Sequence, residues 1–200
     1  MGLAMGERGQ ISETRAFLRS FFAHPRLVGA VLPTSRRTVR KTLDLADLRS
    51  ARLVVELGAG TGVYTRELLA RLRRDARLVA FEIDPRLAAR LARDLEDPRL
   101  EVVASSAERI ESHAAAGAID VIVSALPFTS LPPAVRRSVL DASLRGLSPT
   151  GVMLVLQYSP LMRAELERVF GSVARRISPI NLPPAFVYRC MPAHGRAEAP

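Results

Sequence analysis

The sequence predicts an α/β fold built on a doubly wound, mostly parallel sheet, because apolar segments of strand length alternate with segments of helical periodicity. The clearest unit is residues 53–62, Leu-Val-Val-Glu-Leu-Gly-Ala-Gly-Thr-Gly, where a short apolar strand runs into a glycine-rich turn. Apolar residues at helical spacing follow directly, from Tyr64 to Leu72. A strand, a turn and a helix in this order form the first crossover of such sheets, whose ligands bind at the carboxyl ends of the strands.

The turn contains three alternating glycines, Gly58, Gly60 and Gly62. Glycine is needed where the backbone adopts angles that a Cβ atom excludes and where a ligand lies against the main chain. Dinucleotide sites usually have the spacing G-x-G-x-x-G rather than G-x-G-x-G, so an NAD-type site is the less favoured alternative. The next predicted strand carries Glu82 near its end, where an acid is well placed to accept both hydroxyls of a nucleoside ribose.

The other elements are predicted in order along the chain. We expect helices at 10–24, 35–46, 85–95, 132–146 and 161–170, and strands at 77–83, 100–104, 119–123, 152–156, 172–178 and 185–191. Pro25 ends the first helix, Thr34 or Ser35 caps the second, and Pro85 occupies the first turn of a later one. The segment just before the first strand is placed to fold over a nucleotide as a lid.

Length and composition indicate one domain with a sizeable core among the 200 residues. No segment reaches the run of about eighteen apolar residues that spans a bilayer, and the N-terminus lacks a signal-peptide hydrophobic region, so we expect the chain in the cytoplasm. Cys190 is the single cysteine, which excludes an internal disulfide and a cysteine-cluster metal site. The three histidines are scattered, and no metal site is expected.

The net charge of +9 is the unusual bulk property, and it indicates a polyanionic partner, either nucleic acid or an anionic membrane surface. Lys41 is the only lysine, so the arginine content reflects genomic composition as much as function. The distribution is more informative. Residues 1–50 hold nine basic and four acidic residues, a net +5 of the total +9.

The predicted helix at 10–24 is amphipathic and rich in phenylalanine. At 100° per residue, one arc of about 140° contains Ile11, Thr14, Phe17, Leu18, Phe21 and Phe22. Arg8, Arg15 and Arg19 lie along one edge of that arc. A basic amphipathic helix of this kind suits a membrane interface, and the alternative is that its apolar face packs on the domain.

The stretch E-L-G-A-G-T-G, followed by F-E-I-D at 81–84, resembles motif I and the second-strand acid of class I S-adenosylmethionine-dependent methyltransferases, over roughly residues 50–160. The resemblance implies a Rossmann-like, seven-stranded sheet that ends in an antiparallel hairpin, with S-adenosylmethionine as cofactor and S-adenosylhomocysteine as product. It implies these cofactor-binding residues: Ser35, Glu56, Gly58, Gly60, Thr61, Gly62, Glu82, Ile83, Ser106, Ala107 and Ser124. Ser106 stands where this superfamily often has an acid that meets the adenine amino group, and a hydroxyl accepts that bond more weakly.

A candidate catalytic loop, Ser124-Ala125-Leu126-Pro127-Phe128, follows the strand at 119–123. It resembles the N-L-P-Y loop of methyltransferases that act on amino nitrogens. The Ser124 hydroxyl and backbone carbonyls such as that of Leu126 would accept hydrogen bonds from the amine. The reaction is an in-line displacement, so positioning is the main contribution of the protein. Tyr158 is the candidate to orient the amine, and a structural tyrosine with a satisfied hydroxyl is the equal alternative.

Five short segments together look like bacterial phospholipid N-methyltransferases: residues 17–20 (FLRS), 29–35 (GAVLPTS), 124–127 (SALP), 157–160 (QYSP) and 181–184 (NLPP). Ala125 departs from the more usual S-G-L-P. The resemblance implies stepwise methylation of phosphatidylethanolamine toward phosphatidylcholine by a peripheral enzyme at the inner face of the cytoplasmic membrane. The expected partners are then a phospholipid substrate and an anionic membrane surface, with no nucleic acid.

This resemblance favours a division of the chain at residue 34. Residues 1–34 are predicted to bind the membrane and residues 35–200 to form the catalytic domain. The expected membrane-binding residues are Arg15, Phe17, Leu18, Arg19, Phe21 and Phe22.

Two other functions are open at this point. An rRNA adenine dimethylase shares the sheet, the glycine turn and the L-P-[YF] loop, and would stack a flipped adenine on Phe128. Against it, the loop begins with Ser124 rather than Asn, and no residues follow the predicted hairpin for the helical domain that such enzymes carry. A non-catalytic basic membrane adaptor is the third possibility, and it would not need an intact cofactor site.

Overall fold

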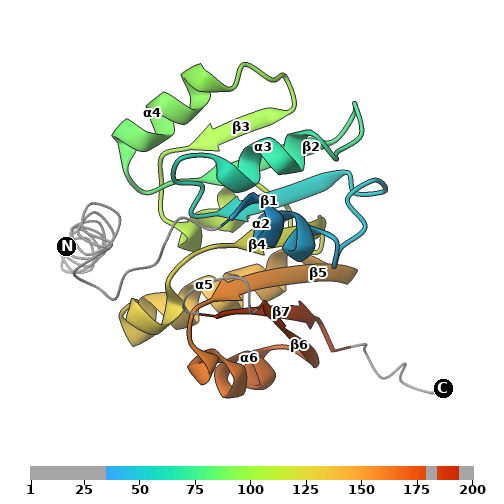
Figure 1. Ribbon diagram of the computed structural model, residues 1–200, viewed down its shortest axis with the longest axis vertical. Helices are drawn as coiled ribbons and strands as arrows, with labels where there is room; N and C mark the ends of the chain where they lie inside the picture. The colour runs from blue at the N-terminus through green and yellow to red at the C-terminus, as the bar shows by residue number, and fades with distance from the viewer. Residues whose placement is uncertain (1–34, 179–183, 194–200) are drawn as a thin grey trace.

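The computed structural model describes residues 35–178 and 184–193. Within them one seven-stranded sheet has the order β3-β2-β1-β4-β5-β7-β6 (Figure 1). The strands are β1 (Leu53–Leu57), β2 (Arg77–Phe81), β3 (Leu100–Val103), β4 (Ile119–Ser124), β5 (Leu147–Gln157), β6 (Ser172–Ser178) and β7 (Ala185–Met191). The helices are α2 (Arg36–Leu43), α3 (Val63–Leu69), α4 (Pro85–Asp94), α5 (Pro133–Gly146) and α6 (Arg163–Val169), with 3₁₀ turns η1 (Ala107–Ser112), η2 (Phe128–Ser130) and η3 (Pro160–Met162).

The sheet is parallel through its first five strands and antiparallel at its end. β1 pairs with β2 and β4, β2 with β3, and β4 with β5, all in parallel. β7 then pairs antiparallel with β5 and β6. The predicted fold class is confirmed: a Rossmann-like, mostly parallel sheet with a C-terminal antiparallel hairpin. From β1 the chain adds β2 and β3 on one side and then crosses to add β4 and β5 on the other. Sheets of this kind bind their ligands at this switch point, between β1 and β4.

Alternate residues of the strands build two cores, one on each face of the sheet. Val54 of β1 faces a cluster that includes Val39 of α2 and Leu68 of α3. Val55, its neighbour, faces a cluster formed with η1, α5 and α6, in which Leu140 is fully buried. Helices therefore cover both faces, as Figure 1 shows. Because both faces are covered, the central strands are apolar on both sides rather than alternating with polar residues.

Two of the five described α-helices, α2 and α4, begin at a residue whose side chain caps the helix. The Ser35 hydroxyl accepts a hydrogen bond from the Thr38 amide at 3.1 Å and so caps α2. Asp84 caps α4 in the same way, through the Arg86 amide at 2.8 Å, and Pro85 occupies its first turn. These contacts satisfy amide groups in the first turns of the two helices.

The largest difference from the predicted elements is in β5, which begins at Leu147 rather than at residue 152. The β4–β5 register shifts there, since Ile119 pairs with Leu147 and Val121 with Val152. Pro149 lies inside this irregular stretch, and proline has no amide hydrogen to donate to a ladder. The proline therefore lies at an irregularity inside the strand, ahead of the predicted start at residue 152.

Smaller differences concern helix ends. α2 stops at Leu43 and α6 begins at Arg163, each a short distance inside the predicted range. The 3₁₀ turns η1 and η2 were not predicted, since single turns carry too little periodicity to be recognised. Among the described residues, no helix has the length and apolarity required to cross a bilayer. The predicted helix at 10–24, its six membrane-binding residues and most of the Asn181-Leu182-Pro183-Pro184 segment lie outside the described residues.

Candidate active site

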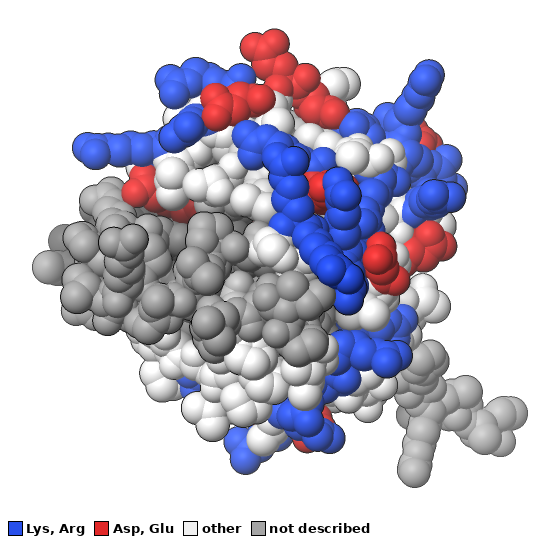
Figure 2. Space-filling model, in the orientation of Figure 1, with Lys and Arg blue, Asp and Glu red and all other residues white. Residues whose placement is uncertain are grey.

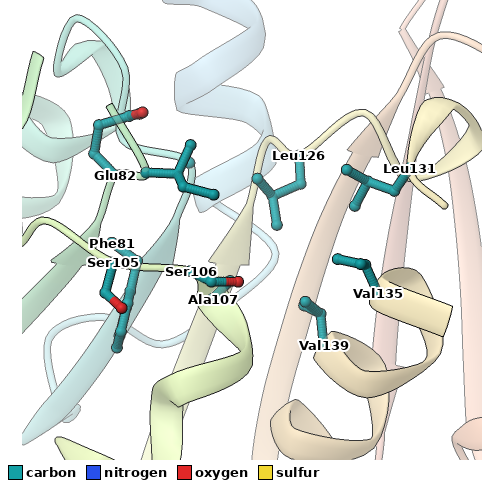
Figure 3. A pocket seen from close by; sticks show the side chains of 11 residues that line it. Phe81, Glu82, Ser105, Ser106, Ala107, Leu126, Leu131, Val135 and Val139 are labelled. Carbon is teal, nitrogen blue, oxygen red and sulfur yellow. The ribbon is translucent and has the colours of Figure 1, made fainter. Parts of the chain in front are cut away.

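A cavity opens at the carboxyl ends of β1, β2, β3 and β4 and encloses about 410 Å³, part of it open to solvent. Figure 3 shows Glu82, Ser105 and Ser106 on one side, with Leu131, Val135 and Val139 facing them from α5 and the segment before it. Six of the predicted site residues line this cavity: Gly58, Glu82, Ile83, Ser106, Ala107 and Leu126.

The glycine turn has the geometry that its spacing predicts. Gly58 and Gly60 both have positive φ, 79° and 54°, which a residue with a Cβ atom rarely adopts. A Cβ atom on Gly58 would approach Leu126 Cδ2 to 2.8 Å, so the turn packs directly against the loop after β4. A Cβ atom on Gly60 would meet nothing within 4 Å. The main chain at Gly60 therefore borders open space that a ligand can enter.

Glu82 fixes the turn and faces the cavity at the same time. One carboxylate oxygen accepts the Gly60 amide at 2.8 Å, and the other accepts the Asp84 amide at 2.9 Å. The side chain is 2% exposed. Burial raises the pKa of Glu82, and the two amide hydrogen bonds partly offset that effect. Each carboxylate oxygen keeps a lone pair, so the pair of ribose hydroxyls predicted here finds two acceptors.

Away from Glu82, the cavity is bordered by the Ser106 hydroxyl and, facing it, by an apolar wall. Ser106 donates its hydroxyl hydrogen to Glu108 Oε2 at 2.9 Å, which leaves the Ser106 oxygen as an acceptor. Leu131, Val135 and Val139 form the opposite wall. A planar aromatic ring such as a nucleobase fits between an apolar wall and a polar rim, because its faces are apolar and its edge forms hydrogen bonds.

Glu56 lies near the turn on the other face of the sheet, beneath α2 and α3, and is 1% exposed. Its Oε2 has no hydrogen-bond partner within the described chain, and neither have the buried hydroxyls of Thr42, Tyr64 and Thr65. The pKa of Glu56 is raised to about 7, mainly by burial; the neighbouring Thr65 lowers it in part and the nearby Glu82 adds to the rise. Unpartnered buried polar atoms are uncommon in folded proteins, so this polar cluster (Thr42, Glu56, Tyr64 and Thr65) is suited to accept water or a cationic group.

The predicted catalytic loop is held by hydrogen bonds from Gln157, a residue that was not predicted to belong to the site. The Gln157 side chain is buried, and its Nε2 donates to the Leu126 carbonyl at 2.8 Å and to the Leu156 carbonyl at 2.6 Å. Ser124 is buried at the end of β4, and its hydroxyl accepts the Leu126 amide at 3.4 Å. The Leu126 carbonyl also accepts the Phe128 amide at 2.9 Å, so both of its lone pairs are engaged within the protein. Gln157 belongs to the Q-Y-S-P segment that the resemblance singles out, but the sequence prediction for orienting the amine is its neighbour Tyr158.

Tyr158 and Ser35 lie away from the cavity lining. Tyr158 is half-buried and packs against the core beneath α2 and α3. Ser35 is exposed, and its hydroxyl caps α2, which gives it a structural use beside the predicted cofactor contact. Thr61 and Gly62 form the last part of the turn, where the Gly62 amide donates to the Ala59 carbonyl at 2.9 Å and Gly62 caps α3.

Comparisons with known proteins agree with this geometry. Residues 54–151 match the family model described as "Methyltransferase domain". An ornithine lipid N-methyltransferase from Singulisphaera acidiphila is 32% identical over 180 residues, 87% of this chain and 93% of that protein. Ribosomal RNA small subunit methyltransferase A from Rhodococcus opacus is 34% identical over 130 residues, but the match spans 43% of its length. Among solved structures, precorrin-6y C5,15-methyltransferase from Geobacter metallireducens has a TM-score of 0.63 at 18% identity, covering 80% of this chain and 90% of that one.

The residues present fit an S-adenosyl nucleoside, since the open space at Gly60, the acceptors on Glu82 and the apolar wall are its required surfaces. Together with the near full-length relative, this shows that the chain belongs to the class I S-adenosylmethionine-dependent methyltransferases and uses S-adenosylmethionine as its cofactor.

Proposed function

We propose that this methyltransferase acts on the primary amine of a membrane-lipid headgroup, with phosphatidylethanolamine as the acceptor and ornithine lipid as the second candidate. The observation that carries the proposal is the match to the ornithine lipid N-methyltransferase over 93% of that protein, whereas the Rhodococcus rRNA relative matches over less than half of its length. Ornithine and ethanolamine headgroups share a primary alkyl amine, so the same chemistry serves both.

The complete burial of Phe128 supports a lipid amine over an adenine as the methyl acceptor. The rRNA alternative requires this aromatic ring to stack on a flipped base. Phe128 is 0% exposed and belongs to the core beneath α5, and its carbonyl accepts Arg136 Nη1 at 3.2 Å. A ring packed in this way offers no free face to a base.

The loop after β4 is the proposed grip on the amine. S-adenosylmethionine supplies a methyl group activated by a sulfonium. The chain must hold the acceptor nitrogen in line with that methyl, and the proposed groups are the Ser124 hydroxyl and the Leu126 carbonyl, which must exchange the Gln157 or Phe128 hydrogen bond for the amine. Tyr158, the third predicted residue, lies away from the cavity lining. Gln157 holds the Leu126 carbonyl in place. Positioning of this kind contributes most of the rate of a displacement reaction.

The acceptor amine must also lose a proton. An alkyl ammonium has a pKa near 10, so the neutral form costs about 4 kcal/mol at pH 7. An apolar cavity and a neighbouring positive charge both lower that pKa. Leu126 and Leu131 line the cavity next to the loop, so desolvation is available without a dedicated base.

Location at the inner face of the cytoplasmic membrane is part of the proposal, because a lipid headgroup is presented at a bilayer surface. The residues predicted to insert, Phe17 and Phe21 among them, precede the described part of the chain.

The test is transfer of a radiolabelled methyl group to four acceptors: vesicles with phosphatidylethanolamine, vesicles with ornithine lipid, amine-free phosphatidylglycerol vesicles and an rRNA fragment. We expect label in one or both amine lipids and none in the other two. Label in the rRNA fragment alone would overturn the proposal. The adaptor alternative predicts no transfer to any acceptor, with vesicle binding unchanged in a variant that cannot bind the cofactor.

A further inference from the structure

The cationic residues of α2 all lie on one side of the helix. At 100° per residue, Arg36, Arg37, Arg40 and Lys41 fall within an arc of about 140°, and all four are exposed. The buried residues Thr38, Val39, Thr42 and Leu43 occupy the opposite arc. The helix is therefore anchored by one side and presents only positive charge on the other.

These charges are largely uncompensated. Arg40 is the member with an ion pair, to Glu67 at 3.1 Å. Arg36, Arg37 and Lys41 have no ion-pair partner in the part of the chain that the structure describes. Residues 36–77 as a whole contain eleven Lys and Arg and five Asp and Glu. Figure 2 shows the positive side chains gathered over the region where α2 and α3 lie in Figure 1.

The position of this surface relative to the active site follows from two contacts between α2 and α3. Arg40 pairs with Glu67, and Asp44 pairs with Arg71 at 2.8 Å, so the two helices run parallel at a constant offset. Arg36 is then level with Val63, the first residue after the glycine turn. The N-terminal charges of α2 therefore lie toward the carboxyl edge of the sheet, where the cofactor cavity opens.

We infer that this α2 cationic surface (Arg36, Arg37, Arg40 and Lys41) docks on the anionic headgroups of a lipid bilayer, and so holds the carboxyl edge of the sheet at the level of the acceptor amines. The inference rests on the proposed lipid-amine activity. An anionic bilayer suits the surface because it offers many charges in a plane, and binding to them needs no matching pocket. A basic residue near such a surface strengthens binding about fivefold.

The experiment uses the full chain and vesicles that contain phosphatidylglycerol, with phosphatidylcholine vesicles as the uncharged reference. The test variant combines Arg36→Gln, Arg37→Gln and Lys41→Gln. The matched control combines Arg109→Gln, Arg137→Gln and Arg168→Gln, which removes the same charge from exposed positions on the opposite face. We expect the α2 variant to bind anionic vesicles about 100-fold more weakly, from three steps of about fivefold, and the control to stay within about threefold of wild type.

Two further measurements separate this inference from the proposed function. Both variants should methylate a water-soluble, short-chain phosphatidylethanolamine at the wild-type rate, because neither changes the cavity. Equal vesicle binding by the α2 variant and the control would overturn the docking surface while the lipid activity stands. Loss of binding to an rRNA fragment, with vesicle binding retained, would overturn it in favour of nucleic acid. Absence of transfer to any amine lipid would instead contradict the proposed function.

Discussion

The two faces of the sheet differ in the polarity of their buried cores and in the charge of the helices that cover them. Beneath η1, α5 and α6 the core is apolar, and four arginines above it form ion pairs: Arg136–Glu165, Arg137–Asp141, Arg145–Glu111 and Arg163–Glu167. Beneath α2 and α3 lies the polar cluster with unpartnered atoms. The outside of that face carries the pairs Arg40–Glu67 and Arg71–Asp44 and, beside them, Arg36, Arg37 and Lys41, which have no ion-pair partner in the described chain. Residues 107–170 contain six basic and six acidic residues, whereas residues 36–77 have an excess of six basic ones.

This contrast indicates which face serves stability and which serves binding. Satisfied buried groups stabilise a fold, while unsatisfied buried groups and like charges gathered on one surface cost stability and are retained where a ligand or surface uses them. The α5–α6 face also contributes to the cavity, but through apolar side chains such as Val135 and Val139. The difference between the faces is therefore one of chemistry, and each side of the comparison can be tested.

The largest expected effect is on the apolar face. Leu140→Ala removes a side chain that is 0% exposed in the core beneath α5, so we expect a loss of about 2–5 kcal/mol in the free energy of unfolding. Urea denaturation measures the loss, and calorimetry should show an unchanged affinity for S-adenosylmethionine. A large loss of affinity for S-adenosylmethionine in a variant that is still folded would show that this face contributes to cofactor binding as well as to stability.

The second prediction concerns Glu56 in the polar cluster. Its pKa is about 7 in the folded protein, against 4.5 for an unperturbed glutamate. The folded state therefore binds the proton more tightly than the unfolded chain. The contribution of protonated Glu56 to the free energy of unfolding is fully present below pH 4.5 and is lost as the pH rises through 7. The loss amounts to roughly 3 kcal/mol. Glu56→Gln should raise the free energy of unfolding relative to wild type at pH 8 and change it little at pH 4.5.

Denaturant unfolding of both proteins at the two pH values measures this difference. A Glu56→Gln variant that loses stability equally at both pH values would mean that the carboxylate is compensated in the folded state, and the proposed difference between the two faces would be weaker.

The third prediction tests the cavity itself. Glu82→Ala removes the acceptor of the Gly60 and Asp84 amides and the predicted acceptors for the ribose. We expect 10- to 100-fold weaker cofactor binding, since hydrogen bonds to a charged group contribute about 1.5–3 kcal/mol. Calorimetry gives the affinity, and Glu165→Ala on the opposite face, which loses the ion pair to Arg136, is the control. An affinity equal to that of the control would count against the ribose contact.

The smallest expected effect compares two buried hydrogen bonds on the α5–α6 face, one at the loop after β4 and one within α5. Gln157→Met removes the donor to the Leu126 carbonyl at nearly constant side-chain length, and Ser143→Ala removes a buried donor to the Val139 carbonyl at 2.7 Å. Each should cost about 1 kcal/mol of stability. The Gln157 variant should also lower kcat about tenfold with a soluble amine acceptor, because the catalytic loop is misplaced. Equal kcat values for the two variants would leave Gln157 with a structural role alone.

The predictable part of the fold was what local patterns encode. The glycine spacing at 58–62 and the apolar runs of the central strands predicted the crossover, and Pro85 located the start of α4. The start of β5 was not predicted because residues 147–151 lack the continuous apolar run of 152–156, and they join the strand only through pairing with β4. Such pairing is a long-range property that no local window contains.

The site was predictable to the same degree. Gly58, Glu82 and Ser106 follow strand ends, so their meeting at one cavity follows from the parallel topology. Gln157 was missed because its role is a contact with Leu126, thirty-one positions away, and nothing in its own neighbourhood reveals that partner.

The sequence by itself determined the class of sheet, the turn that holds the nucleoside and the excess of positive charge, because these depend on residue type and spacing along the chain. Only the tertiary structure decided which face that charge occupies, that Glu56 is buried beside unpartnered hydroxyls, and that Gln157 holds the Leu126 carbonyl. These features depend on which distant segments the sheet brings together, and burial and hydrogen bonding act between neighbours in space.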